Sequence, residues 1–182
     1  YFFADATVNI QPSAEELAEI ALLCASEVKR LGYEPRVAML SFSNFGSSRH
    51  ALAEKVKQAV RIVRQQAPGF SIDGEMQADT AVTSTLIDEY FPFSSLANKN
   101  GANVLIFPDL EAGNIAYKLL QRLGGAEAIG PILMGMHKPV NLLQFGDFDE
   151  WDVVSIAAIT VGDSQHSHES PPWHSPLFQA SA

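Results

Sequence analysis

Three polar segments of the chain have the composition to hold a negatively charged ligand, and each follows a short apolar run of strand length. They are Ser41–Ser48, Pro108–Asn114 and Gly135–Gly146. In an open parallel sheet, ligands bind beyond the carboxyl ends of the strands. We therefore expect the binding chemistry of this chain to lie in these segments.

The first segment, Ser41–Ser48, precedes a helix-like stretch and combines Gly46 with neighbouring hydroxyl groups. Free amides and the helix dipole at such a position suit a phosphate or another anion. The segment lacks the GxxxxGK[ST] pattern of a P-loop, and an ordinary capped turn explains the same residues. Both interpretations remain open on these residues alone.

The other two segments carry weaker signals. Asp109, Glu111 and Asn114 stand at one helix start, where the helix dipole favours acidic residues even without a ligand. His137 and Lys138 stand in the third segment, but no nucleophile or orienting acid is next to His137 in the sequence. The chain has no GxSxG, CxxC, HExxH or GxGxxG motif. These residues indicate an anion-tolerant cleft and no particular reaction.

Neither the single cysteine nor the C-terminal histidines indicate chemistry. Cys24 lies on the apolar face of a predicted helix with no cation beside it, which favours a small buried residue over a reactive thiol. His166, His168 and His174 fall in a Ser- and Pro-rich stretch without a full set of partners at ligand spacing. This favours a solvated tail over a metal site.

The composition excludes several classes of protein. The chain has 182 residues, with 12 Lys+Arg against 21 Asp+Glu, a formal charge of −9, and 47% hydrophobic residues. The acidic balance argues against nucleic acid, and no apolar run reaches the roughly 18 residues of a membrane-spanning helix. A single cysteine fits a reducing, cytoplasmic setting. Because the chain opens at Tyr1 rather than Met, we expect it to be part of something longer.

Strand-like and helix-like stretches alternate, which predicts an α/β fold with a largely parallel sheet flanked by helices. A capping box at Ser13 and Glu16 predicts the start of the first helix. Further helices are expected after Ser48, over Leu110–Leu123 and over Trp151–Val161, with a weak helix and a loop over Thr80–Gly101. The expected strands are one within Tyr1–Ile10, Arg36–Phe42, Ser71–Glu75, Asn103–Phe107 and Ala128–Met134.

Five segments, taken in order, resemble the phosphate acetyl/butyryltransferase family. They are Phe3–Ala21, Arg36–Ser48, Asp73–Ala81, Asn103–Gly125 and Gly130–Gly146. The resemblance implies transfer of an acyl group between coenzyme A and phosphate, a fold like that of isocitrate and isopropylmalate dehydrogenases, and dimerisation. It also implies that the N-terminal lobe is missing. Residues 1–165 would form a partial phosphotransacetylase-like domain, with 166–182 as an extended tail.

One departure from the family pattern bears on activity. In the family that this chain resembles, the members that catalyse the reaction have a Ser-Arg-Gly run after Pro-Val-Asn. This chain has Gln144-Phe145-Gly146 at that place. The resemblance assigns the Ser to the thiol and the Arg to phosphate, and a Phe can neither stabilise an oxyanion nor bind phosphate bidentately. Phe45 also stands where a Lys is common. We therefore expect the transacetylase reaction to be lost.

The Gln-Phe-Gly run resembles that of the C-terminal domain of bacterial hybrid malic enzymes. This implies a regulatory and oligomerisation domain that binds acetyl-CoA as an effector, with no catalytic residue of its own. NAD(P), a divalent metal and the oxidative decarboxylation of malate to pyruvate would belong to an absent malic-enzyme part. An active phosphate acetyl- or butyryltransferase is the alternative, and a purely structural assembly domain is a third interpretation.

Each interpretation except the last needs contacts to an acyl-CoA, and every candidate residue can also be explained as a turn or cap residue. The candidates are Ser43, Asn44, Gly46, Ser47, Asp109, Glu111, Gly113, Asn114, Lys138, Asn141 and Gln144. A homo-oligomer is expected, and neither nucleic acid nor a membrane is an expected partner.

Overall fold

The computed structural model describes residues 1–66, 69–143 and 149–166. By its internal contacts the chain divides into two units, Tyr1–Glu127 and Ala128–Ala182. The predicted boundary between residues 165 and 166 stays a prediction, because residues 167–182 lie outside the described part.

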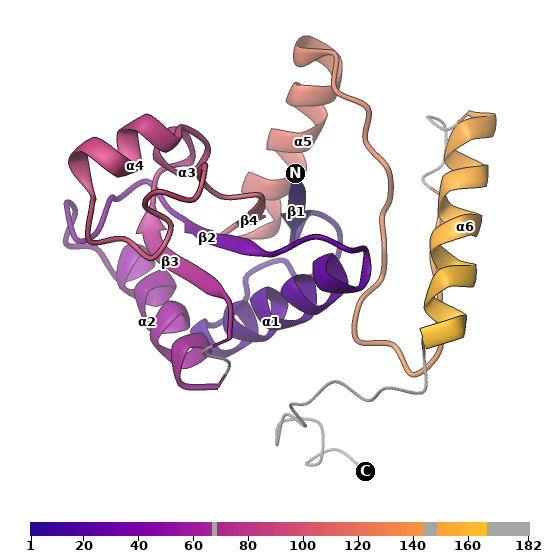
Figure 1. The fold of residues 1–182 in the computed structure, drawn as a ribbon, viewed down its shortest axis with the longest axis horizontal. Coiled ribbons are helices and arrows are strands. Elements are labelled where there is room, and N and C mark those ends of the chain that lie inside the picture. Colours follow the sequence, from indigo (N-terminus) through magenta and orange to yellow (C-terminus); the bar gives the residue numbers. More distant parts are fainter. Residues whose placement is uncertain (67–68, 144–148, 167–182) are drawn as a thin grey trace. The chain divides into compact units, whose positions relative to one another are not determined.

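The first unit is built on a parallel four-stranded sheet with the strand order β1-β4-β2-β3 (Figure 1). The central strand β2 pairs with both neighbours, so that Val37 lies opposite Ile72 on one side and Val104 on the other. The strands are β1 (Phe2–Ala4), β2 (Arg36–Leu40), β3 (Ser71–Met76) and β4 (Val104–Ile106). The predicted α/β class with a parallel sheet is confirmed, and the carboxyl ends of the strands share one edge.

Helices cover both faces of this sheet, as Figure 1 shows for α1 and α2 on one side and α3 and α4 on the other. Successive strand residues point to opposite faces, so Val37 and Met39 face α1 and α2 while Ala38 and Leu40 join the other core. That second core includes Ile87 of α4. The helices are α1 (Ala14–Arg30), α2 (Ala51–Gln66), α3 (Ala78–Val82), α4 (Ser84–Tyr90) and α5 (Leu110–Gly124).

Short-range hydrogen bonds explain where α1 and α5 begin. The amide of Glu16 donates to Ser13 Oγ at 3.2 Å and the amide of Ser13 donates to Glu16 Oε2 at 2.7 Å, so the predicted capping box is confirmed. Asp109 caps α5 by accepting from the amide of Ala112 at 2.8 Å. The helix α5 ends at Gly124, and its C-cap Gly125 has a φ of 66°, in the left-handed region.

The second unit contains α6 (Glu150–His166), and its residues 128–143 form neither a helix nor a named strand. The predicted helix over Trp151–Val161 is confirmed. The strand predicted over Ala128–Met134 is wrong: this stretch forms only an isolated bridge between Ile132 and Asn141. Pro131 lies within it and has no amide to donate to a strand ladder. Among the described residues, no helix combines the length and apolar composition needed to cross a bilayer.

The Cys24 thiol is expected to be inert in the folded chain. Its side chain is buried in α1, and burial, assisted by the nearby charge of Glu27, raises the pKa of Cys24 to about 12. At pH 8 the thiolate fraction is therefore on the order of 10³-fold below that of an exposed cysteine. We expect no labelling by a disulfide reagent until guanidinium unfolds the chain, and rapid labelling of the native chain would contradict this.

Candidate functional site

The first predicted segment forms a tight loop between β2 and α2, and the carboxylate of Glu75 on β3 holds it. Ser43 Oγ donates to Glu75 Oε1 at 2.9 Å, and the amide of Gly46 donates to the same oxygen at 2.6 Å. Glu75 is only 1% exposed. The hydroxyl of Ser43 and the amide of Gly46, which the sequence suggested as donors to an external anion, therefore donate to a carboxylate of the protein itself.

The rest of this loop is also fixed by internal hydrogen bonds. The amide of Asn44 donates to Ser47 Oγ at 2.9 Å, and the side chain of Asn44 exchanges two hydrogen bonds with Gln77. Phe45 and Gly46 both have positive φ, 47° and 88°. A Phe in the left-handed region is uncommon, and it persists only where its surroundings determine it. The loop is thus a preformed feature whose shape β3 and its flanks specify.

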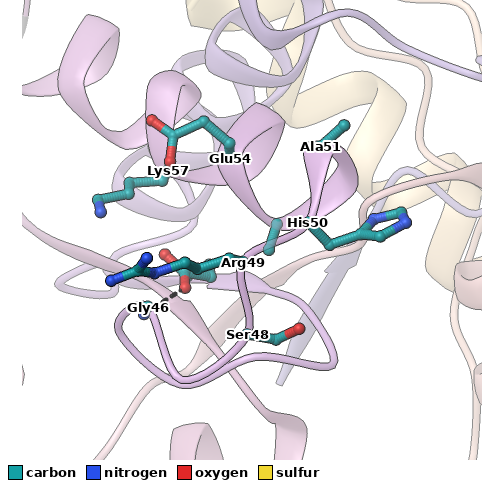
Figure 2. A pocket seen from close by; sticks show the side chains of 9 residues that line it. Gly46, Ser48, Arg49, His50, Ala51, Glu54 and Lys57 are labelled. Carbon is teal, nitrogen blue, oxygen red and sulfur yellow. Dashed lines mark hydrogen bonds between the residues drawn. The ribbon is translucent and has the colours of Figure 1, made fainter.

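A hollow of about 480 Å³ opens between this loop and the first turns of α2 (Figure 2). The side chains of Arg49, His50, Glu54 and Lys57 line it, together with Glu75. Within the described residues, Arg49 and Lys57 make no ion pair, whereas Glu54 accepts from Arg61 at 3.2 Å. Two cations that make no ion pair in the described part of the chain, beside a preformed loop, are a suitable place for a phosphate group.

The strand β3 carries two functional candidates that the sequence did not indicate, Asp73 and Glu75. Asp73 is buried and accepts from Arg64 Nη2 at 2.6 Å and from Ser94 Oγ at 2.9 Å, which ties a distant loop to the strand. The run Asp73-Gly74-Glu75 could have revealed them, because it places two carboxylates in one short predicted strand. Charges buried in a strand need specific partners, which marks such residues as candidates.

The second predicted segment performs capping and packing in the structure. Asp109 caps α5, Glu111 is exposed, and Asn114 Nδ2 donates to the backbone oxygen of Ala6 at 3.2 Å. A Cβ on the buried Gly113 would lie 2.2 Å from the backbone oxygen of Asp5. Ligand contacts by these residues stay a prediction, since each already has a structural role.

Replacing Gly113 with alanine is expected to destabilise the chain strongly. The added methyl group would meet backbone atoms of Asp5, which cannot move aside as a flexible side chain can. Overpacking of this kind costs about 1–3 kcal/mol, and urea unfolding would measure it. The matched control is Gly124→Ala, whose Cβ meets only the side chain of Leu120 at 3.0 Å. Equal stability of the two variants would contradict this account.

The carboxylate of Asp5 accepts three amides from the chain that follows it, those of Thr7, Val8 and Asn9. Partial burial raises the pKa of Asp5, but these hydrogen bonds together outweigh it and hold the pKa below its ordinary value of 3.8. A lowered folded-state pKa stabilises the fold above the ordinary value and loses that stabilisation as the pH falls through the lower one. Asp5→Asn should therefore reduce the loss of stability below about pH 4, as urea unfolding at several pH values would show. An unchanged pH profile would contradict this.

The third segment lies in the second unit. Asn141 Oδ1 accepts from the amide of Leu133 at 3.0 Å, and Asn141 Nδ2 donates to Thr160 Oγ1 of α6 at 2.9 Å. Lys138 is exposed. Gln144 lies outside the described residues. The structure therefore gathers Ser43, Asn44, Gly46 and Ser47 in one loop and places the Asp109–Asn114 group at the start of α5, whereas Lys138 and Asn141 belong to the second unit.

Comparison with known proteins establishes the family to which this geometry belongs. The profile of the family described as phosphate acetyl/butaryl transferase matches residues 1–161. The chain belongs to this family, as its sequence segments indicated. The phosphate acetyltransferase of Bacillus subtilis is 48% identical over 164 residues, which are 90% of this chain and 50% of that enzyme. The enzyme of Thermoanaerobacterium thermosaccharolyticum is 50% identical over 166 residues, again 50% of its length.

Solved structures agree with the sequence comparison. A phosphotransacetylase from Streptococcus pyogenes has a TM-score of 0.83 and 43% identity, covering 90% of this chain and 49% of that one. The EutD phosphotransacetylase from Staphylococcus aureus has the same TM-score with 40% identity, over 89% and 49%. The chain thus spans about half the length of the relatives it matches.

The malic-enzyme interpretation of the sequence is wrong as the main function. The NADP-dependent malic enzyme of Escherichia coli is 49% identical over 144 residues, but these are only 19% of that enzyme. Relatives matched over about 90% of this chain are phosphate acetyltransferases. That interpretation rested on two positions, Gln144 and Phe145, and not on the pattern of the whole chain. The oxidoreductase assignment depended on it and is therefore also wrong.

Proposed function

We propose that this chain is half of a phosphate acetyltransferase, an enzyme that moves an acetyl group between coenzyme A and phosphate. The observation that carries this proposal is the 46–50% identity to four phosphate acetyltransferases over about 90% of the chain. Acetyl-CoA is then a substrate rather than an effector. Because the chain covers about half of each of these relatives, the complete reaction needs both halves.

The reaction places defined demands on the protein. The CoA thiolate attacks the carbonyl carbon of acetyl phosphate, and the tetrahedral intermediate then expels phosphate. Such a reaction requires donors for the oxyanion and cations for the departing phosphate. The cations Arg49 and Lys57 beside the 43–48 loop suit the second demand.

A chimera tests the proposal while supplying the other half of the enzyme. The half of the Bacillus subtilis phosphate acetyltransferase that matches this chain would be replaced by it. We expect the purified chimera to form acetyl-CoA from acetyl phosphate and CoA, well above the rate of the buffer and of the isolated chain. A chimera that folds cooperatively, as judged by thermal unfolding, and yet shows no turnover would contradict the proposal. Oligomerisation and a cytoplasmic location stay predictions.

A further inference from the structure

The side chain of Lys55 leaves α2 and ends between two segments that are far from it in the sequence. Its Nζ donates to the backbone oxygens of Pro12 and Pro108, each at 2.9 Å. Each of these prolines stands directly before the N-cap residue of a helix, Ser13 for α1 and Asp109 for α5. A single ammonium group therefore joins the starts of α1 and α5 to α2.

The joined segments leave three neighbouring strands of the sheet at the same edge. The order β1-β4-β2 places β4 between the other two strands. The helix α1 follows β1, α5 follows β4, and α2 follows β2. In an open parallel sheet, ligands bind at the edge formed by the carboxyl ends of the strands. Lys55 thus fixes the mutual positions of three segments at the edge where a substrate is expected.

The partners of Lys55 favour a positioning role over ion pairing. The side chain is partly buried, and within the described residues it makes no ion pair. It donates instead to two backbone oxygens, and hydrogen bonds from a charged donor are about twice as strong as those between neutral groups. A backbone hydrogen bond of 3.1 Å, from the amide of Leu110 to the oxygen of Ile10, joins the segments before α5 and α1 to each other. Lys55 adds α2 to this pair.

The start of α2 is also where the candidate site lies. The 43–48 loop leads into this helix, and Arg49 and Lys57 line the hollow beside the loop. The Asp109–Asn114 segment begins directly after the carbonyl group that Lys55 holds. Two groups of candidate residues that are separate in the sequence are therefore connected through one side chain.

We propose that Lys55 is a positioning residue for acetyl transfer, whose two hydrogen bonds align the start of α5 and the segment before α1 with the 43–48 loop. The inference rests on the proposed function, because it concerns the rate of that reaction. A displacement of about 1 Å can lower a rate about 10²-fold, since the reacting groups must be aligned. Because Lys55 donates to the protein itself, its loss should lower kcat far more than it changes KM.

Lys55→Met in the chimera tests this alignment, because methionine keeps an unbranched stem and removes the donors. We expect kcat to fall at least about tenfold, and KM for acetyl phosphate and for CoA to change less than about threefold. The matched control is Gln58→Ala, which removes a 3.3 Å hydrogen bond from Gln58 Nε2 to Glu15 Oε1 that joins α2 to α1. The control should leave kcat unchanged, and equal kcat values for the two variants would overturn the proposal.

Chemical restoration of the side chain separates hydrogen bonding from charge. Alkylation of a Lys55→Cys chimera with 2-bromoethylamine restores an ammonium with N–H donors, whereas (2-bromoethyl)trimethylammonium adds the same charge without donors. The chain's single natural cysteine, Cys24, is buried, and the unaltered chimera treated in the same way corrects for other cysteines. We expect only the first adduct to recover kcat, to within a few-fold of the unaltered chimera. Recovery by both adducts, or by neither, would overturn the proposal.

Hydrogen exchange tests the contact without reference to catalysis. In the chain itself, Lys55→Met should lower the protection of first-turn amides of α1 and α5, such as Leu17 and Gly113, at least several-fold. Unchanged protection at both helix starts would overturn the proposal. A folded chimera without activity would refute the proposed function and the kinetic role together, and exchange would still decide whether the contact exists. An active chimera whose kcat is insensitive to Lys55→Met would refute the positioning role alone.

Discussion

Introducing serine and arginine at positions 144 and 145 is expected to raise kcat of the chimera about 100-fold or more. A preorganised donor to an oxyanion or a departing phosphate is worth about 10²–10³ in rate. The family resemblance places a hydroxyl and a guanidinium where this chain has Gln144 and Phe145. Initial rates of acetyl-CoA formation at saturating acetyl phosphate and CoA would measure the change.

The control for this gain is Phe145→Leu, which removes the ring without supplying a cation. It should leave kcat within a few-fold of the unaltered chimera. If the serine–arginine pair gives no more than the leucine variant, the chain uses other groups for these two tasks, and the rate limitation assigned to positions 144 and 145 is wrong.

Replacing Glu75 with alanine is expected to give the largest loss of stability among the side chains around the 43–48 loop. The change removes the acceptor of Ser43 Oγ, which is buried, and of the amide of Gly46, which is exposed, and a buried donor left unpaired costs about 1–3 kcal/mol. The free energy of unfolding should therefore fall by about 1–3 kcal/mol, as urea titration would show. The loop should also become susceptible to limited proteolysis.

Glu54→Ala provides the matched control, because it removes a glutamate from the same hollow. The side chain of Glu54 is 57% exposed and pairs only with the equally exposed Arg61, an arrangement worth at most about 1 kcal/mol. Similar losses in the two variants would show that Glu75 does not hold the loop.

The fold was predictable because its signals are local. The capping box at Ser13, the apolar run of β2 and the acidic cap at Asp109 each lie within a few residues of the element they define. The failure over Ala128–Met134 has the same origin, since a run of apolar residues resembles a strand whether or not a partner strand lies beside it.

The candidate site was less predictable because its partners are far apart in sequence. The loop at Ser43 is held by Glu75, 32 residues later, and Asp73 is paired with Ser94, 21 residues later. The sequence showed that the 43–48 loop could accept an anion, but only the fold shows that a carboxylate of the chain already occupies those donors. A single buried residue changes which ligand the loop suits.

The function was misjudged for a different physical reason. The exchange of Ser-Arg for Gln144-Phe145 alters two donors, whereas the family profile matches residues 1–161, a range that contains the sheet, the 43–48 loop and the start of α5. A reduced set of donors lowers a rate by a finite factor and does not by itself convert a transferase into a regulatory domain.

The most direct measurement is the phosphate-dependent release of CoA thiol from acetyl-CoA by the chimera. The account predicts that thiol release requires inorganic phosphate and that acetyl phosphate appears in equal amount. Thiol release that is the same without phosphate, or that yields acetate instead of acetyl phosphate, would contradict it.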